Sequence, residues 1–391
     1  MIAAEVKYKK TGNEWVPEIP EHWDFRRLKN FAVIGSGQDQ KGIENDNGKY
    51  SIYGTGGLMG KTNEFLYEGP SVILGRKGTI DNPFYVTEPF WTVDTAYYTK
   101  IKENVDPRFF FYCCLTIQFD YYKYGSAVPS MSQRDLNQIR LPYPPLEEQK
   151  IIADFLDEQS AKITRFIQTK QRFIELLKEQ RQSIITNAVT KGLSAEQAGI
   201  DDSVKMKETV LGEIPEHWGV RRLKTLVEMK SGENITAESI YQTGEYPVYG
   251  GNGLRGFTKT YTNEGEFVLI GRQGALCGNI NYAAGKFFAS EHAVVVYPKV
   301  ELDYFWLGET LRMMNLNQYS MAAAQPGLAI NNIRVLPVPF PPIEEQKRIV
   351  EHIKTETRTL DIAISKAERE IELIKEYREA MIAEAVTGKI L

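Results

Sequence analysis

Residues 18–29 read EIPEHWDFRRLK and residues 213–224 read EIPEHWGVRRLK, so that ten of these twelve positions are identical. Identity this dense is not expected by chance and indicates an internal duplication. Four further matched pairs follow in the same order, each at a spacing of 196 or 197 residues: YSIYGTGGLMG (50–60) with YPVYGGNGLRG (246–256), VILGRKGT (72–79) with VLIGRQGA (268–275), PPLEEQK (144–150) with PPIEEQK (341–347), and AVTKGL (188–193) with AVTGKI (385–390). The chain is therefore one unit written twice.

Each unit divides into a globular part and a helix. The globular part is rich in Gly, Tyr and short β-branched runs, which is typical of strands joined by turns. A proline pair and two glutamates then suit a helix N-terminus. We predict an α+β protein of two tandem pseudo-repeats, each an α/β domain followed by a long helix. The expected segments are an N-terminal tail (1–12), a first domain (13–145), a first helix (146–192), a linker (193–208), a second domain (209–342) and a second helix (343–391).

Apolar residues recur every seven positions along both expected helices, which is typical of a coiled-coil seam. At 1.5 Å per residue, a helix of about 45 residues is a rod of about 65 Å, too long to pack wholly against its own domain. We therefore predict that the two helices pair as an antiparallel coiled coil with pseudo-two-fold symmetry. The heptad positions are Leu156, Ile163, Lys170, Leu177 and Ile184 in the first helix, and Ile353, Leu360, Ala367, Ile374 and Met381 in the second.

The composition is that of a globular protein, with 42% hydrophobic and 25% charged residues. Three cysteines give neither an even disulfide framework nor paired CxxC ligands, which favours a reducing cytoplasm and no metal site. No run is apolar enough for a signal peptide or a membrane span, so we expect a cytoplasmic protein with no membrane partner. The formal net charge of −4 neither supports nor excludes DNA binding, because a local basic surface or partner subunits can supply phosphate contacts.

Two motifs suggest nucleotide or methyltransferase chemistry, but the duplication argues against both. Gly251, Gly253 and Gly256 form a GxGxxG, yet the first repeat has Thr55 in place of Gly251 and no βα unit precedes the motif, so a glycine-dependent turn is favoured. Residues 82–85 (NPFY) resemble the loop with which adenine methyltransferases grip a flipped base, but the second repeat reads NINY there.

The histidines carry no catalytic pattern. His22 with Trp23, and His217 with Trp218, open the two units, where a packing or partner-docking role is favoured over base contact. His292 has no counterpart in the other repeat, so catalysis or metal binding there is not expected.

The PEHW opening, the YG and GRxG turns and the proline-proline-hydrophobe-EEQ start of each long helix resemble type I restriction-modification system specificity (S) subunits across essentially the whole chain. The resemblance implies that residues 13–145 and 209–342 are target-recognition domains, which read the halves of an asymmetric bipartite DNA target, and that the helices set the gap. It also implies two modification and two restriction subunits as partners. Those partners would hold S-adenosylmethionine, ATP and Mg, and this chain would hold no cofactor, metal or catalytic residue.

Candidate DNA-binding residues lie in the turns and in the polar loops before each helix. Arginine can donate two hydrogen bonds to guanine, glutamine can pair with adenine, and lysine can meet phosphate or guanine. The turns Gly75–Gly78 and Gly271–Gly274 supply the first candidates. The full set is Arg76, Lys77, Arg272, Gln273, Lys61, Arg255, Lys259, Ser126, Ser130, Gln133, Gln325 and Asn331.

Two other classes of protein compete with the specificity subunit: a solitary DNA methyltransferase, and a coiled-coil interaction protein with no DNA role. A methyltransferase would bind its cofactor as an isolated chain. A pure interaction protein would leave adenine methylation unchanged when deleted. A bipartite methylation pattern that depends on the chain would exclude both.

Overall fold

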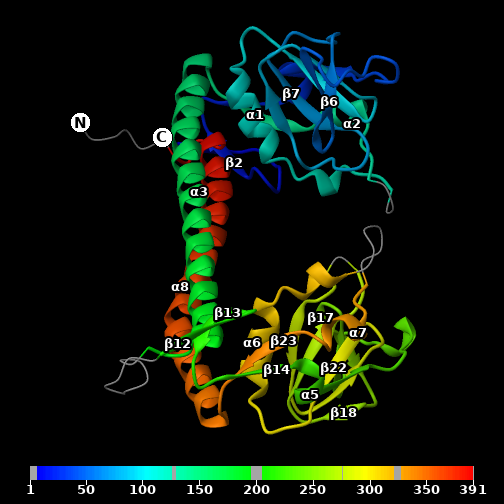
Figure 1. Cartoon of the computed structure of the whole chain (residues 1–391). Coiled ribbons are helices and arrows are strands. Elements are labelled where there is room, and N and C mark those ends of the chain that lie inside the picture. The colour runs from blue at the N-terminus through cyan, green and yellow to red at the C-terminus, as the bar shows by residue number, and fades with distance from the viewer. Residues whose placement is uncertain (1–6, 126–128, 195–204, 275, 321–326, 391) are drawn as a thin grey trace, which may run out of the picture. The chain divides into compact units, whose positions relative to one another are not determined.

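The computed structural model describes residues 7–125, 129–194, 205–274, 276–320 and 327–390. The chain forms two compact units, which do not follow the repeat boundaries: unit 1 comprises Met1–Gln171 and Glu368–Leu391, and unit 2 comprises Arg172–Ala367. Each unit contains one globular part and portions of both long helices, α3 (Leu146–Lys191) and α8 (Ile343–Val386) (Figure 1). Among the described helices, none is long and apolar enough to cross a membrane.

Unit 1 contains two sheets and two two-stranded ribbons. The larger sheet has the order β4-β10-β7-β8 and the smaller one β6-β5-β9, in which β5 and β9 run parallel. The ribbons are β1-β2 and β3-β11. The strands are β1 (Tyr8–Lys10), β2 (Glu18–Pro20), β3 (Asp24–Arg27), β4 (Ala32–Ser36), β5 (Tyr50–Gly54), β6 (Gly57–Thr62), β7 (Ser71–Gly75), β8 (Phe84–Val86), β9 (Phe90–Thr92), β10 (Ala96–Ile101) and β11 (Arg140–Tyr143), and the helices are α1 (Pro107–Leu115) and α2 (Gln133–Gln138).

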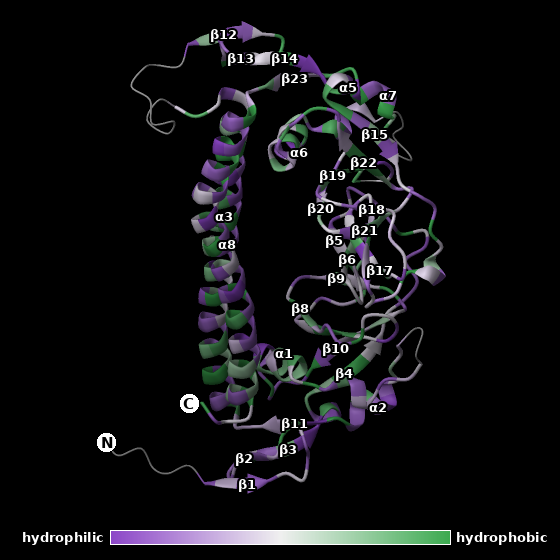
Figure 2. Cartoon of the chain, turned by 90° about the horizontal axis from the view of Figure 1, so that it is seen from below, coloured by the Kyte–Doolittle hydropathy of each residue, from purple (hydrophilic) through white to green (hydrophobic). Residues whose placement is uncertain are grey.

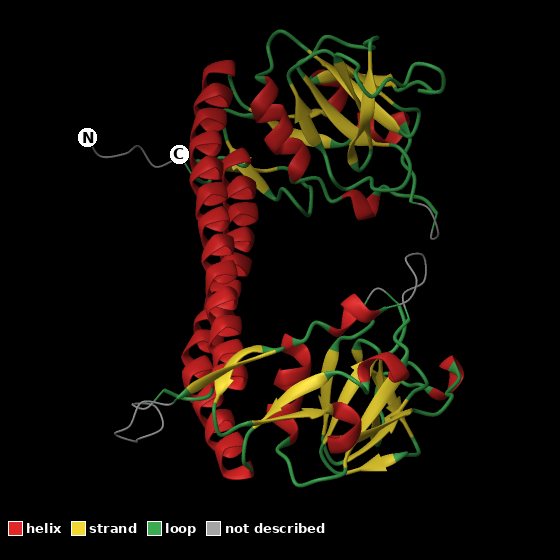
Figure 3. Ribbon diagram, in the orientation of Figure 1, coloured by secondary structure: helices red, strands yellow, loops and turns green. Residues whose placement is uncertain are grey.

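Unit 2 repeats this arrangement, with sheets β15-β22-β19-β20 and β17-β16-β21-β18 and ribbons β12-β13 and β14-β23. Figure 3 draws the strands in yellow, gathered mostly beside the red long helices, with β12 drawn across them in this view. The strands are β12 (Met206–Thr209), β13 (Gly212–Pro215), β14 (Gly219–Arg222), β15 (Val227–Ser231), β16 (Tyr246–Gly250), β17 (Gly253–Thr258), β18 (Asn263–Glu264), β19 (Phe267–Gly271), β20 (Ile280–Ala283), β21 (Lys286–Ala289), β22 (Ala293–Pro298) and β23 (Pro337–Phe340), and the short helices are α5 (Leu223–Leu226), α6 (Tyr304–Met313) and α7 (Ile330–Ile333).

The stretch expected to be an N-terminal tail contains a strand. Its residues Tyr8–Lys10 form β1, which pairs with β2. It also has a counterpart in the other repeat, because β12 pairs with β13 in the same way. That strand begins at Met206, inside the stretch expected to be a linker, whose residues 195–204 lie outside the described residues. The two ribbons also share sequence, because residues 6–11 (VKYKKT) match residues 204–209 (VKMKET) at four of six positions. This match was missed because three more residues separate it from the EIPEHW motif in the first repeat than in the second.

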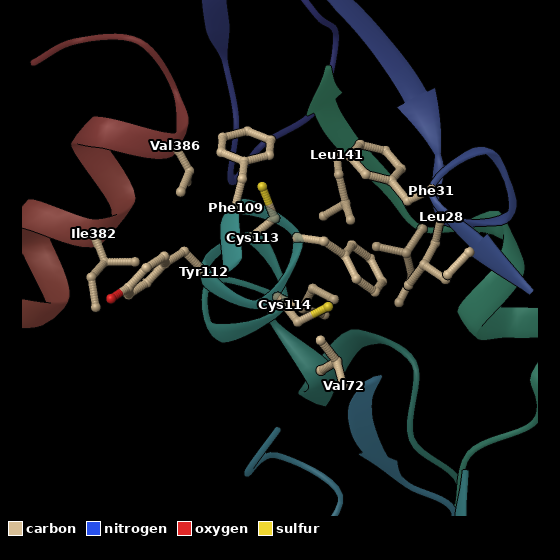
Figure 4. Packing of buried hydrophobic residues seen from close by; sticks show 14 of the residues in the cluster. Leu28, Phe31, Val72, Phe109, Tyr112, Cys113, Cys114, Leu141, Ile382 and Val386 are labelled. Carbon is tan, nitrogen blue, oxygen red and sulfur yellow. The ribbon is translucent and has the colours of Figure 1, made fainter. Parts of the chain in front are cut away.

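The hydrophobic core of unit 1 joins the globular part to the helices. Cys113 and Cys114 lie on α1 among buried aromatic and aliphatic side chains, and Tyr112 faces Ile382 of α8 (Figure 4). Residues of α3 such as Leu156 belong to the same cluster. Unit 2 has an equivalent cluster, which includes residues of both long helices. Burial of these apolar faces anchors each globular part to its helices.

The long helices pack against each other in both units, and their antiparallel direction follows from their ion pairs. Lys170 Nζ lies 2.6 Å from Glu370 Oε2 in unit 1, and Arg181 Nε lies 2.7 Å from Asp361 Oδ1 in unit 2. Lys170, the one charged residue among the predicted heptad positions, is thus an ion-pairing residue. The seam departs from the strict heptad near its end, where Ile185 is fully buried and Ile184 is not. Both helices mix hydrophilic with hydrophobic residues along their length, as Figure 2 shows.

A repeated joint connects each globular part to the start of its long helix. In unit 1, Glu148 on α3 accepts hydrogen bonds from Trp23 Nε1 at 2.7 Å and from His22 Nε2 at 3.0 Å. In unit 2, Glu345 on α8 lies 2.7 Å from His217 Nε2. The PEHW and EEQ motifs therefore bind each other. This outcome agrees with the structural role favoured for the histidine-tryptophan pairs.

Candidate nucleic-acid interface

Loops from distant parts of the sequence meet beside the Gly75–Gly78 turn of unit 1. The backbone N–H groups of Arg76 and Lys77 both donate to Thr95 O, at 2.9 and 3.0 Å. On the other side, Gly78 N donates to Pro129 O at 2.9 Å, and Lys77 forms a β-bridge with Ser130. These bonds hold the basic turn between the loop that precedes β10 and the loop that precedes α2.

The β5–β6 hairpin completes this group of loops. A Cβ built on Gly78 would lie 3.7 Å from Thr55 Oγ1, so the hairpin tip lies against the basic turn. At the end of β4, Ser36 Oγ accepts a hydrogen bond from Gln133 Nε2 at 3.0 Å. We name the group the first loop cluster, and it comprises residues 36–38, 54–58, 75–78, 93–95 and 129–133.

Unit 2 builds the same arrangement. Arg272 N donates to His292 O at 2.9 Å, and Gln273 forms a β-bridge with Gly327, just as Lys77 does with Ser130. A Cβ on Gly251 would lie 3.4 Å from Gln273 O, so the β16–β17 hairpin tip again meets the turn. The second loop cluster comprises residues 231–232, 250–254, 271–274, 290–292 and 327–330. Gly251 and Gly253 thus belong to a hairpin rather than to a strand-to-helix nucleotide loop.

The arginine of each cluster is held by its own unit. Arg76 Nη1 donates to Asp94 O at 3.0 Å, and its guanidinium lies 5.9 Å from the centre of the Tyr97 ring. Arg272 Nη1 instead donates to Ser231 Oγ at 3.1 Å. Since a guanidinium carries five N–H donors, each arginine retains several for a ligand. Restraint by the protein also lowers the entropy that each side chain loses when it binds.

Gln273 differs from Lys77 in both chemistry and restraint. Its Oε1 lies 3.0 Å from His292 Nδ1, and His292 Nε2 lies 3.1 Å from Glu291 Oε1. Because an amide oxygen only accepts, the His292 ring donates to it. The NH2 group of the Gln273 side chain, which can only donate, is then left to face a ligand. Lys77 is exposed, and it too can only donate.

The other candidate residues are placed unevenly. Arg255 is exposed on β17, and its side chain lies against Gly250 at the hairpin. Lys61 lies at the end of β6 away from the hairpin tip, since it pairs with Ser51 near the start of β5. Lys259 follows the corresponding end of β17 and lies 6.0 Å from the Tyr241 ring.

Asn331 is exposed on α7, and its Oδ1 accepts a hydrogen bond from Arg334 Nη1 at 3.3 Å. Ser126 and Gln325 lie outside the described residues. The structure thus gathers Arg76, Lys77, Ser130 and Gln133 in the first cluster and Arg272 and Gln273 in the second. Arg255 lies beside its cluster, and Lys61 and Lys259 lie apart.

Sequence reasoning missed three members of the clusters. Ser36 and Ser231 hold a neighbouring polar side chain in their own cluster, and the repeated Ser-Gly pair at 36–37 and 231–232 was a usable signal. His292 was set aside for lack of a counterpart, although it contacts Gln273. Within the part of the chain that the structure describes, no group of three or more His, Cys, Asp or Glu residues could hold a metal.

The family model for the type I restriction modification DNA specificity domain matches residues 20–176 and 215–373, most of the chain. The chain belongs to this family. The specificity subunit of the type I restriction enzyme EcoprrI from Escherichia coli is 31% identical over 72% of this chain and 69% of its own length. The MjaVIII specificity subunit from Methanocaldococcus jannaschii is 22% identical over 95% of this chain and 94% of its own length.

A solved chain from a study of complex assembly and conformational transition of the type I R-M system matches with a TM-score of 0.71 and 16% identity, over 95% of this chain and 99% of that one. At that identity the match shows the fold alone. The resemblance and the fold of two repeated domains with packed long helices, both predicted from the sequence, are confirmed. As a specificity subunit, the chain is a DNA-recognition component of a restriction-modification complex and not its catalytic one.

Proposed function

We propose that the first and second loop clusters each read one half of a split, asymmetric DNA target. One observation carries the proposal: the same backbone arrangement is built twice, with different side chains at matched positions. Lys77 in the first cluster corresponds to Gln273 in the second, and Ser130 corresponds to Gly327. Equal scaffolds present different chemistry, so the half-sites differ.

The side-chain types suit the major groove and the phosphate backbone. Arg76 and Arg272 can donate to phosphate or to guanine, and Lys77 can donate to either. Ser130, Gln133 and Asn331 supply polar contacts, and Arg255 adds charge beside the second cluster. Lys61 and Lys259, which lie away from the hairpin tips, suit phosphate contacts at the edge of each half-site.

Partner subunits supply the chemistry and part of the affinity. In this proposal two modification subunits carry S-adenosylmethionine and methylate adenine, and two restriction subunits use ATP and Mg, all in the cytoplasm. The formal charge of −4 supports this division, because a chain with little net attraction for phosphate needs partners that supply it. The paired helices set the unread gap between the half-sites.

The test is long-read mapping of N6-methyladenine in cells that carry the partner modification subunit, with and without this chain. We expect a split, asymmetric motif that appears only when the chain is present. An undivided motif would contradict the two-cluster proposal. Methylation that ignores the chain would refute its role in target choice.

A further inference from the structure

Two leucines are exposed at the same position of the two repeats. Leu58 on β6 is 63% exposed, and Leu254 on β17 is 56% exposed. Each follows a glycine whose positive φ, +110° at Gly57 and +89° at Gly253, favours a residue without a side chain. Both hairpins also carry a β-bulge at the matching place, where the residue after each leucine, Met59 on β6 and Arg255 on β17, has no pairing partner on the neighbouring strand. The same backbone device therefore presents the same side chain twice.

Packing within the chain does not account for these leucines. In the sheets that the described residues form, β6 lies beside β5 alone and β17 beside β16 alone, so both are edge strands, where exposed apolar residues favour aggregation. Their other backbone hydrogen bonds, with Asn45 and Tyr241, lie at the strand ends away from the hairpin tips. The next position is not kept, since Met59 in one repeat corresponds to Arg255 in the other. An exposed leucine that is identical in both repeats, beside a position that changes, indicates a contact with a partner.

That partner is the DNA of the half-site. Leu58 is three residues from Thr55, which lies against the Gly75–Gly78 turn, and Leu254 is three residues from Gly251, which lies against Gln273. Each leucine thus belongs to a hairpin that touches the basic turn of its loop cluster. Because the clusters carry different polar side chains, a leucine common to both suits what the half-sites share, namely the stacked base pairs and the adenine that is methylated.

We propose that Leu58 and Leu254 are apolar wedges that press into the base stack and lower the cost of extruding the target adenine to the modification subunit. Apolar side chains inserted between base steps unstack them in other DNA complexes, and enzymes that modify a base must take it out of the duplex. The inference rests on the proposed function and assigns to this chain a share of the base-opening step.

The test compares Leu58→Ala and Leu254→Ala in the complex with the modification subunits, on a duplex carrying the target mapped for the unaltered chain. Each variant should slow methylation of one adenine, on one strand, by roughly 10- to 100-fold, and the two variants should affect opposite strands. Neither should change the recognised motif. A duplex with a mismatch opposite the affected adenine should restore the rate, because a mismatched base costs less to extrude.

The controls separate this inference from the proposed function. Val33→Ala removes a side chain that is also exposed, on β4, and should leave both rates unchanged. Wild-type rates in both leucine variants, a loss that the mismatch does not restore, or a changed base preference at one position would each overturn the wedge while the specificity role stands. If the unaltered complex methylates no split target, the proposed function itself fails.

Discussion

Gln149 Oε1 accepts a hydrogen bond from the backbone N–H of Asp106 at 2.9 Å, and both residues are buried. Asp106 in turn caps α1 by accepting from the N–H groups of Arg108 and Phe109, both at 3.0 Å. The second repeat has the same relationship, with Gln346 and Asp303 at 2.9 Å. The glutamine of the EEQ motif therefore ties the start of each long helix to a helix of its globular part.

Gln149→Ala should weaken this joint in unit 1. The variant leaves the buried N–H of Asp106 without a partner, which costs about 1–3 kcal/mol. Hydrogen exchange at Asp106 and in the first turn of α1 should speed up accordingly, with exchange in α6 unchanged. Lys150→Ala is the matched control, because it removes an exposed ion pair with Glu147 from the same turn and should cost little. Unchanged exchange at Asp106 would contradict the role given to Gln149.

The two glutamates that face the histidines should not be equivalent. Glu148→Ala removes the acceptor of the buried Trp23 Nε1, and the lost hydrogen bond should cost about 1–3 kcal/mol. Glu345→Ala removes a contact with the half-exposed His217, whereas Trp218 Nε1 has no hydrogen-bond partner to lose among the described residues. We expect a cost below about 1 kcal/mol there. Urea unfolding of the two variants should show this order, and equal costs would contradict it.

The repeated joint also shows how far sequence reasoning reaches. The duplication, the long helices and their pairing could be predicted, because identical letters and a heptad period are local signals. The binding of Glu148 to His22 could not, since it joins motifs 126 residues apart whose contact depends on the fold. Strand β1 was missed, although residues 6–11 match residues 204–209, because the segment between this match and the EIPEHW motif is three residues longer in the first repeat.

The members of the candidate site also divide into those that a repeated sequence motif indicates and those that only the fold brings together. Arg76 and Lys77 could be found because the GRxG turn is repeated in the sequence. Their neighbours could not all be found: Thr95 and Pro129 contribute backbone carbonyl groups, which any residue carries. Leu58 was overlooked because an apolar letter in a strand predicts burial, and only the structure shows it exposed.

Lys77→Gln should alter the base preference of the first half-site alone. Lys77→Gln introduces an amide that can both donate and accept, because Thr95 occupies the place that His292 takes beside Gln273. Such an amide suits adenine, and the preference at one base pair of the first half-site should shift about 5- to 100-fold. Methylation of a randomised target library measures this shift. Lys100→Gln, an exposed lysine on β10, is the control, and a change in the second half-site would contradict the assignment.

His292→Ala should act on the second half-site alone. Without the ring, Gln273 Oε1 is free to accept, so the base pair that Gln273 contacts should begin to tolerate adenine. The same library measures the effect. A general loss of methylation with the base preference unchanged would indicate that His292 only supports the fold of its loop.

The buried thiols should make stability fall at alkaline pH. Burial raises the pKa of Cys113 and of Cys114 above the ordinary value of 9.0. In the unfolded chain both thiols ionise above about pH 9, whereas the folded chain keeps them protonated. The free energy of unfolding is therefore unaffected by these thiols below pH 9. Above pH 9 it declines by about 1.4 kcal/mol per pH unit for each thiol. Replacing both cysteines with alanine should make the free energy of unfolding fall less steeply above pH 9. The same slope in the variant and in the unaltered chain would contradict the role given to the thiols.

Shortening both long helices by one heptad should shorten the gap between the half-sites without changing either half. Residues 172–178 of α3 and 363–369 of α8 lie between the ion pairs Lys170–Glu370 and Arg181–Asp361, so their removal leaves both pairs intact. Seven residues correspond to about 700° of helix rotation, so after the deletion the apolar seam still faces nearly the same direction. Each helix becomes about 10 Å shorter, which is at most the length of about three base pairs of DNA. Removal of two residues from each helix is the control, because a turn of about 200° faces the seam away from its partner and should destabilise the pair. Methylation mapping measures the gap, and an unchanged gap or an altered half-site would contradict a spacer role for the helices.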